Sequence, residues 1–86
     1  MEMNTFKNGN NIEFWTWFYT NEFKTNIEFF GAGKRDYEEE LKKVYNELLN
    51  SKDYSLKNID NEDFYIRHSA NGLIAQLEAI ENILGI

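Results

Sequence analysis

The chain contains a single histidine, His68, and catalysis by a nucleophile paired with a histidine base would have to use it. The available hydroxyl nucleophiles are Ser51, Ser55 and Ser69. Ser69 directly follows His68 in a segment with the pattern of a β-strand, where neighbouring side chains point to opposite faces. The G-x-S-x-G nucleophile elbow does not occur in the sequence. We therefore interpret His68 as a structural residue.

Three charged clusters match ligand sites only in part. Residues 60–63 offer carboxylates for Ca²⁺ or Mg²⁺, but an EF-hand loop starting at Asp60 would need glycine where Tyr65 stands. Residues 31–35 combine two glycines with two basic residues, yet their spacing does not fit a P-loop. The three glutamates at 38–40 suit the first turn of a helix. The sequence thus predicts no metal site and no cofactor, and we expect a protein that is not an enzyme.

The composition is that of a small globular protein. With 86 residues there is room for one domain, predicted over 1–86, whose residues 1–11 would form a flexible or edge-strand N-terminus. The 42% hydrophobic and 16% aromatic content indicates a folded core, and the lack of cysteine excludes disulfides. Residues 1–11 lack the pattern of a signal peptide, and no apolar run is long enough to span a membrane. We expect a cytoplasmic protein.

The chain is acidic, with a net charge of −6 at pH 7. Phosphate binding relies on Lys and Arg, so we expect no direct contact with nucleic acid. Mild acidity is ordinary for a cytosolic protein. It also suits an alternative in which the acidic surface competes for a protein partner that has a basic, nucleic-acid-binding surface.

Two segments have the periodicity of amphipathic helices. In residues 36–49 the apolar side chains recur at helical spacing, and Asp36 with Glu39 three residues later fits a capped start. Residues 72–84 carry a second apolar stripe, and Gly85 stands where a C-terminal cap belongs. Both segments are predicted to be helices.

Residues 54–58 and 63–69 are predicted to be strands, joined by a polar hairpin turn at 59–62. In the second strand two sets of side chains alternate, Phe64, Ile66 and His68 with Tyr65, Arg67 and Ser69. Aromatic and β-branched residues favour strands. The predicted fold class is α+β: a small single domain with two or three helices packed on a short antiparallel β-sheet.

Eight of the fourteen aromatic residues lie between Phe14 and Phe30, and this segment fits two structures. A helix beginning near residue 12 would place on one stripe Ile12, Trp15, Tyr19, Phe23, Ile27 and Phe30. Two strands would instead explain the alternation within residues 23–29, and the Thr and aromatic content favours them. Either structure is compatible with an α+β fold.

Residues 14–22, FWTWFYTNE, resemble the opening of a group of small bacterial proteins of uncharacterised function that begin with an FW-x-WF-x-x-NE helix. In that group a second amphipathic helix follows, then two strands, then a Ser-Ala-x-Gly turn and another helix. Residues 36–72 match this order, while residues 24–26 and 31–33 depart from the pattern. The resemblance implies a helix across 12–29 and a fold layout, and it implies no activity.

Two aromatic residues, Phe14 and Trp17, fall away from the main stripe of this helix. If exposed, they would be anchors for a partner, since Trp and Tyr dominate interaction hot spots. If a neighbouring element covers them, they belong to the core. The predicted rim of the contact consists of Glu13, Asn21 and Glu28.

These features predict a non-enzymatic protein-binding protein from a bacterium or phage. We expect a stoichiometric inhibitor of the immunity, antitoxin or phage anti-defence type, which occludes a surface of its partner; this expectation is an analogy of size and charge. The alternative is a homo-oligomeric structural or interaction protein, in which the aromatic surface forms a homodimer interface.

Overall fold

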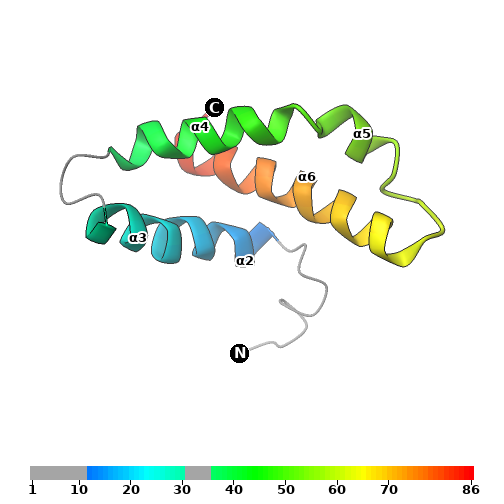
Figure 1. The fold of residues 1–86 in the computed structure, drawn as a ribbon, viewed down its shortest axis with the longest axis horizontal. Coiled ribbons are helices and arrows are strands. Elements are labelled where there is room, and N and C mark those ends of the chain that lie inside the picture. The colour runs from blue at the N-terminus through cyan, green and yellow to red at the C-terminus, as the bar shows by residue number, and fades with distance from the viewer. Residues whose placement is uncertain (1–11, 31–35) are drawn as a thin grey trace.

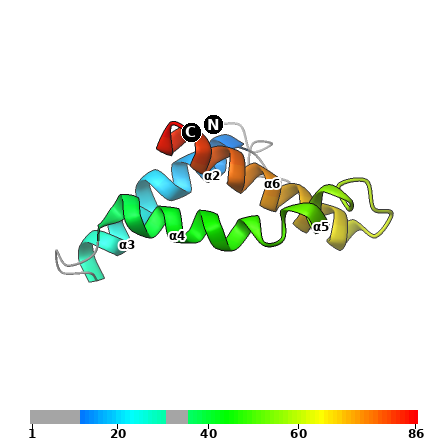
Figure 2. The ribbon, with the colours of Figure 1, turned by 90° about the horizontal axis from the view of Figure 1, so that it is seen from above.

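The computed structural model describes residues 12–30 and 36–86 as a set of packed helices (Figure 1). In chain order these are α2 (Ile12–Trp17), the π-helical segment η1 (Phe18–Glu22), α3 (Phe23–Phe30), α4 (Tyr37–Leu49), α5 (Lys52–Leu56) and α6 (Phe64–Leu84). The first three elements form one continuous rod. α6 packs against α2, α4 and α5, and α5 lies against the first turns of α6 (Figure 2).

The predicted α+β fold is wrong, because both predicted strands are absent. Residues 54–58 cover the end of α5 and the turn that follows it, and residues 63–69 form the start of α6. Within 12–30 and 36–86 there is no strand, so the described part of the chain is all-α. The predicted N-terminal segment 1–11 and the glycine-containing residues 31–35 lie outside the described residues.

Residues 63–69 are helical because Asp63 caps α6 and the spacing that follows is helical. The Asp63 Oδ1 atom accepts hydrogen bonds from the backbone N–H groups of Tyr65 at 2.9 Å and Ile66 at 3.1 Å. Apolar residues then recur every three or four positions, at Ile66, Ala70, Leu73, Leu77 and Ile80. The strand preference of aromatic and β-branched residues depends on context, and here the longer helical pattern overrides it.

The cap at Asp63 can be tested by substitution, because its hydrogen bonds stabilise a helix and would have no counterpart in the expected strand. Replacing Asp63 by alanine should lower the free energy of unfolding by about 1 kcal/mol, because two backbone N–H groups lose their acceptor. Asp60→Ala, in the exposed loop before the cap, is the matched control and should change stability by less than about 0.5 kcal/mol. Urea unfolding followed by circular dichroism measures both. Equal effects of the two substitutions would contradict the capping role.

The helical alternative for the aromatic segment is confirmed, with a π-helical interruption that its periodicity does not indicate. The core-facing residues are spaced by four, at Trp15, Tyr19, Phe23 and Ile27. In an uninterrupted α-helix each such step advances by about 40° around the axis, so the stripe would drift by about 120° in total. The wider π turn reduces this drift. The predicted stripe is wrong at Ile12, which is exposed.

Side chains bind the carbonyl groups at the entrance to the π segment. Thr20 Oγ1 donates to the carbonyl oxygen of Thr16 at 2.7 Å, and Asn21 Nδ2 donates to that of Trp17 at 3.0 Å. A π turn shifts the backbone hydrogen bonds by one residue and leaves carbonyl groups in need of other donors. Adjacent Thr and Asn residues provide these donors locally.

The helices predicted at 36–49 and 72–84 are confirmed, the second as the C-terminal part of α6. Asp36 is the N-cap of α4, and its Oδ2 atom accepts from the backbone N–H of Glu39 at 3.1 Å. Gly85 ends α6 in the left-handed conformation, with φ of 77°, which glycine adopts without steric cost.

The core lies where the N-terminal rod, α4 and α6 meet. Its buried cluster takes one residue from each: Tyr19, Leu41 and Ile80. Leu41 and Ile80 are completely buried. This arrangement makes α6 the common neighbour of the other long helices.

Three tyrosine hydroxyls connect the long helices to one another. Tyr19 donates to Gln76 Oε1 at 2.7 Å, Tyr37 donates to the carbonyl oxygen of Tyr19 at 2.8 Å, and Tyr45 donates to Glu81 Oε2 at 2.7 Å. Burial raises the pKa of Tyr19 and of Tyr37. The pKa of Tyr45 is raised by its hydrogen bond to Glu81, and burial and the charge of that carboxylate add to the effect. All three phenols therefore favour their neutral form in the folded protein.

Candidate partner-binding surfaces

The predicted anchor residues Phe14 and Trp17 lie together on α2. Their ring centroids are 6.4 Å apart, and Phe14 also packs edge-on against Trp15 at 4.9 Å. Trp17 is 50% exposed, whereas Phe14 is less exposed and only partly accessible. Of the two, Trp17 offers the larger apolar surface to a partner.

The three predicted rim residues are all exposed, but they do not surround the anchor. Glu13 and Asn21 lie one turn before and one turn after Trp17, and the Asn21 amide is bonded to the Trp17 carbonyl. Glu28 lies further along the rod, in α3. The structure therefore places Glu13 and Asn21 near Trp17 and Glu28 apart from them.

A second group of exposed apolar residues lies where α5 meets the start of α6, at the opposite end of the molecule from α3 (Figure 1). We call it the docking surface, and it consists of Tyr54, Leu56, Phe64, Tyr65 and Ile66, which are 36–79% exposed. Tyr65 is the most exposed of these. Aromatic residues are enriched in protein interfaces.

Neighbouring side chains pack on the ring of Phe64, one of the residues of this surface. The His68 ring stacks on it with centroids 5.4 Å apart, and the Arg67 guanidinium lies 5.6 Å from its centroid. Arg67 Nη1 also donates to the carbonyl oxygen of Asn61 at 2.9 Å, which ties the preceding loop to α6. His68 was expected on a strand; it lies instead on a helix, where its ring packs on an aromatic neighbour one turn away.

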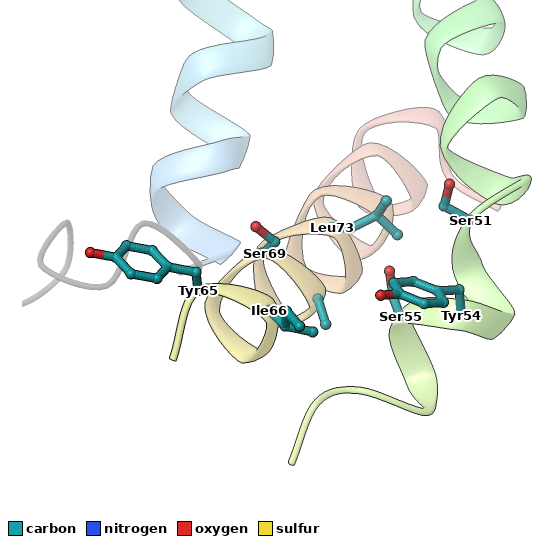
Figure 3. A pocket seen from close by; sticks show the side chains of 8 residues that line it. Ser51, Tyr54, Ser55, Tyr65, Ile66, Ser69 and Leu73 are labelled. Atoms are coloured by element: carbon teal, nitrogen blue, oxygen red, sulfur yellow. The ribbon is translucent and has the colours of Figure 1, made fainter. Parts of the chain in front are cut away.

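A pocket of about 430 Å³ opens between α5 and α6 (Figure 3). Its polar lining side chains are the hydroxyls of three serines and two tyrosines, and its apolar lining comes from Ile66, Ala70 and Leu73. Figure 3 shows Tyr54 and Ser55 directed from α5 towards α6. Hydroxyl groups both donate and accept hydrogen bonds and carry no charge at neutral pH. The pocket is therefore suited to an uncharged group.

The three serines considered as nucleophiles, Ser51, Ser55 and Ser69, all line this pocket. His68 is not among the lining residues, and neither is any carboxylate or amine that could act as a base. Activation of a serine needs such a base within hydrogen-bond reach. The pocket brings the hydroxyls together without the partner that hydrolysis requires.

Among residues 12–30 and 36–86 no group of three or more His, Cys, Asp or Glu side chains is arranged to hold a metal ion. The helices formed by the same residues are all too short or too polar to cross a membrane.

Sequence reasoning did not find the docking surface because it assigned residues 63–69 to a strand. In an antiparallel sheet packed on helices, alternate residues of this segment would have been covered. Because residues 63–69 instead form the first turns of α6, they extend past the part of that helix that packs on α4, and several of their side chains stay exposed. The signal that identifies the helix was present, since Asp63 precedes a series of apolar residues at helical spacing.

Comparison of the chain with known protein families, with curated proteins and with solved structures gave no match.

Proposed function

We propose that the protein is a small, cytoplasmic, non-enzymatic binding protein that acts as a stoichiometric inhibitor. It would cover a functional surface of one protein partner, in the manner of immunity, antitoxin or phage anti-defence proteins. The class is an analogy of size, charge and architecture. The protein-binding role itself rests on the docking surface.

The observation that carries the proposal is the grouping of exposed aromatic residues around a pocket. Tyr54 and Tyr65 are 63% and 79% exposed and both line the pocket, and Phe64 contacts Tyr65 with ring centroids 5.5 Å apart. A few aromatic side chains near the centre of an interface commonly supply most of its binding energy. A pocket beside them can receive a side chain of the partner.

The docking surface is also held in a defined shape. Two side chains of α6 hold the preceding loop by hydrogen bonds. Asn71 Nδ2 donates to the carbonyl oxygen of Ile59 at 3.0 Å, and Arg67 donates to the carbonyl oxygen of Asn61. Asp63 fixes the first turn. Preorganisation lowers the entropy cost of association, which favours tight binding by a small protein.

The test compares capture of partner proteins from a host lysate by the wild type and two single variants. Tyr65→Ser should reduce the amount of the stoichiometric partner at least about tenfold, because an exposed aromatic anchor is lost. Trp17→Ser is the matched control. It removes an exposed aromatic side chain from α2, the surface that the sequence alone predicted, and the variant should retain the partner. Both variants should keep the wild-type melting temperature to within a few degrees, because both side chains are at least half exposed.

Loss of the partner with Trp17→Ser and retention with Tyr65→Ser would assign binding to α2 and contradict the docking surface. A large fall in melting temperature for Trp17→Ser would place that residue in the core. Light scattering after size exclusion tests the homo-oligomer alternative, in which the wild type is a dimer and Tyr65→Ser a monomer.

A further inference from the structure

One buried hydroxyl in the pocket between α5 and α6 has no hydrogen-bond partner among the described residues. Of the buried residues in 12–30 and 36–86, Tyr19 and Ser55 carry hydroxyl groups. The Tyr19 hydroxyl donates to Gln76, whereas no hydrogen bond joins the Ser55 hydroxyl to another described residue. Ser55 is 4% exposed and lines the pocket, and Figure 3 shows its side chain directed from α5 towards α6. Its hydroxyl is therefore available to a molecule that enters the pocket.

Packing alone would favour alanine over serine at position 55. In the described part of the chain no polar side-chain atom is both sealed from solvent and without a partner, so the Ser55 hydroxyl reaches the open space of the pocket. A hydroxyl that is largely shielded from water and lacks a protein partner weakens a fold, and native proteins keep few such groups. Alanine is also the better helix former. A ligand with a hydrogen-bonding group would give this hydroxyl its partner.

The size and lining of the pocket fit a small uncharged molecule. Its volume of about 430 Å³ lies within the range of roughly 300–1,000 Å³ that is typical of small-molecule sites. Ile66, Ala70 and Leu73 form an apolar wall on α6, and the ring of Tyr54 lines the pocket from α5. Aromatic side chains pack well against flat rings. The lining residues carry no charge, so a charged ligand would lose hydration without gaining an opposite charge.

We propose that this pocket binds a small uncharged aromatic compound that carries one hydrogen-bonding group. The ring of the compound packs between Tyr54 and the apolar wall of α6, and its polar group bonds to the Ser55 hydroxyl. This site goes beyond the proposed function, because its ligand is a free small molecule and its binding needs no protein partner.

The probes are three single-ring compounds that differ in one substituent: 4-methylphenol, toluene and 4-methylbenzoate. Binding to the wild-type protein at pH 7 is followed by the NMR chemical shifts of its backbone amides. 4-Methylphenol should bind with a Kd of about millimolar order and shift the amides of residues 51–56 and 65–73. The anionic 4-methylbenzoate should bind at least about tenfold more weakly, because it gives up hydration in an uncharged pocket.

Two serine variants separate the hydrogen bond from the packing of the ring. Ser55→Ala should weaken 4-methylphenol about fivefold and change the affinity for toluene by less than about twofold, because toluene forms no hydrogen bond. Ser69→Ala is the matched control, since it removes a hydroxyl from the same pocket at an exposed position. It should change both affinities by less than about twofold, because an exposed hydroxyl is already hydrated. Ser55→Ala should also keep or raise the melting temperature.

Three results would overturn the proposal. The first is the absence of shifts at residues 51–56 and 65–73 with 4-methylphenol, which would show that the pocket holds solvent only. The second is equal binding of 4-methylphenol and 4-methylbenzoate, which needs no variant. The third is an equal change in affinity for 4-methylphenol and toluene in folded Ser55→Ala. Capture of the lysate partner through Tyr65 is measured separately, so failure here leaves the proposed function standing.

Discussion

Replacing Leu41 by alanine is expected to lower the free energy of unfolding by about 3 kcal/mol. Leu41 is completely buried on α4, in the cluster that joins α4 to the N-terminal rod and α6. Removal of its side chain loses the transfer free energy of the deleted groups and leaves a cavity between three helices. For a domain of this size that loss is a large part of the total stability.

Leu49→Ala is the matched control, since it makes the same chemical change on the same helix. Leu49 is exposed, and its truncation should cost less than about 1 kcal/mol. Urea unfolding followed by tryptophan fluorescence and by circular dichroism gives both values. If the two substitutions had equal effects, the three-helix core described here would be incorrect.

Alkaline pH is expected to destabilise the protein strongly, because three phenols that join the helices resist ionisation. In the folded state the pKa values of Tyr19, Tyr37 and Tyr45 are raised above the ordinary tyrosine value of 10.0. Below about pH 9 these tyrosines are neutral in both the folded and the unfolded state, so their contribution to stability is fully present. Above it the unfolded chain releases protons first, and stability is lost as the pH rises through the folded pKa values.

The measurement is the urea midpoint at intervals from pH 7 to pH 11.5. The contribution of the three tyrosines to the free energy of unfolding should stay constant to about pH 9 and fall above pH 10. Tyr45→Phe removes one of the titrating groups, so it should lower stability at pH 7, where its hydrogen bond to Glu81 is lost, and flatten the alkaline fall. A variant with the same alkaline slope as the wild type would show that this phenol does not titrate with unfolding.

The sequence predicts those helices whose apolar stripe, start and end are all encoded nearby. Residues 36–49 have a continuous stripe and a cap at Asp36, and Gly85 ends α6, so α4 and the C-terminal part of α6 were predicted correctly. The prediction for residues 63–69 was wrong because the alternating pattern of the six residues 64–69 also fits a strand. The signal for a helix is the Asp63 cap together with the apolar spacing that continues to Ile80, and it becomes visible only when the segment is considered with the residues that follow it.

The candidate site is predicted less well than the helices. The position of Trp17 off the helical stripe left open whether a neighbouring element covers it, and the structure shows it 50% exposed. The docking surface depends on which residues remain uncovered once α5 and α6 are packed, and periodicity alone does not contain this information. The π segment at Phe18–Glu22 was not predicted either, because a four-residue spacing such as that of Trp15, Tyr19 and Phe23 also fits an uninterrupted α-helix.

The hydrogen bond from Tyr19 to Gln76 joins residues 57 positions apart, and this separation has a consequence for synthesis. The aromatic helix leaves the ribosome before its main packing partner, α6. At translation rates of about 5–20 residues per second, the tryptophans and phenylalanines of residues 14–29 stay without α6 for seconds. During that interval the nascent chain presents a hydrophobic segment to chaperones, and the fold is completed only when α6 is free to pack.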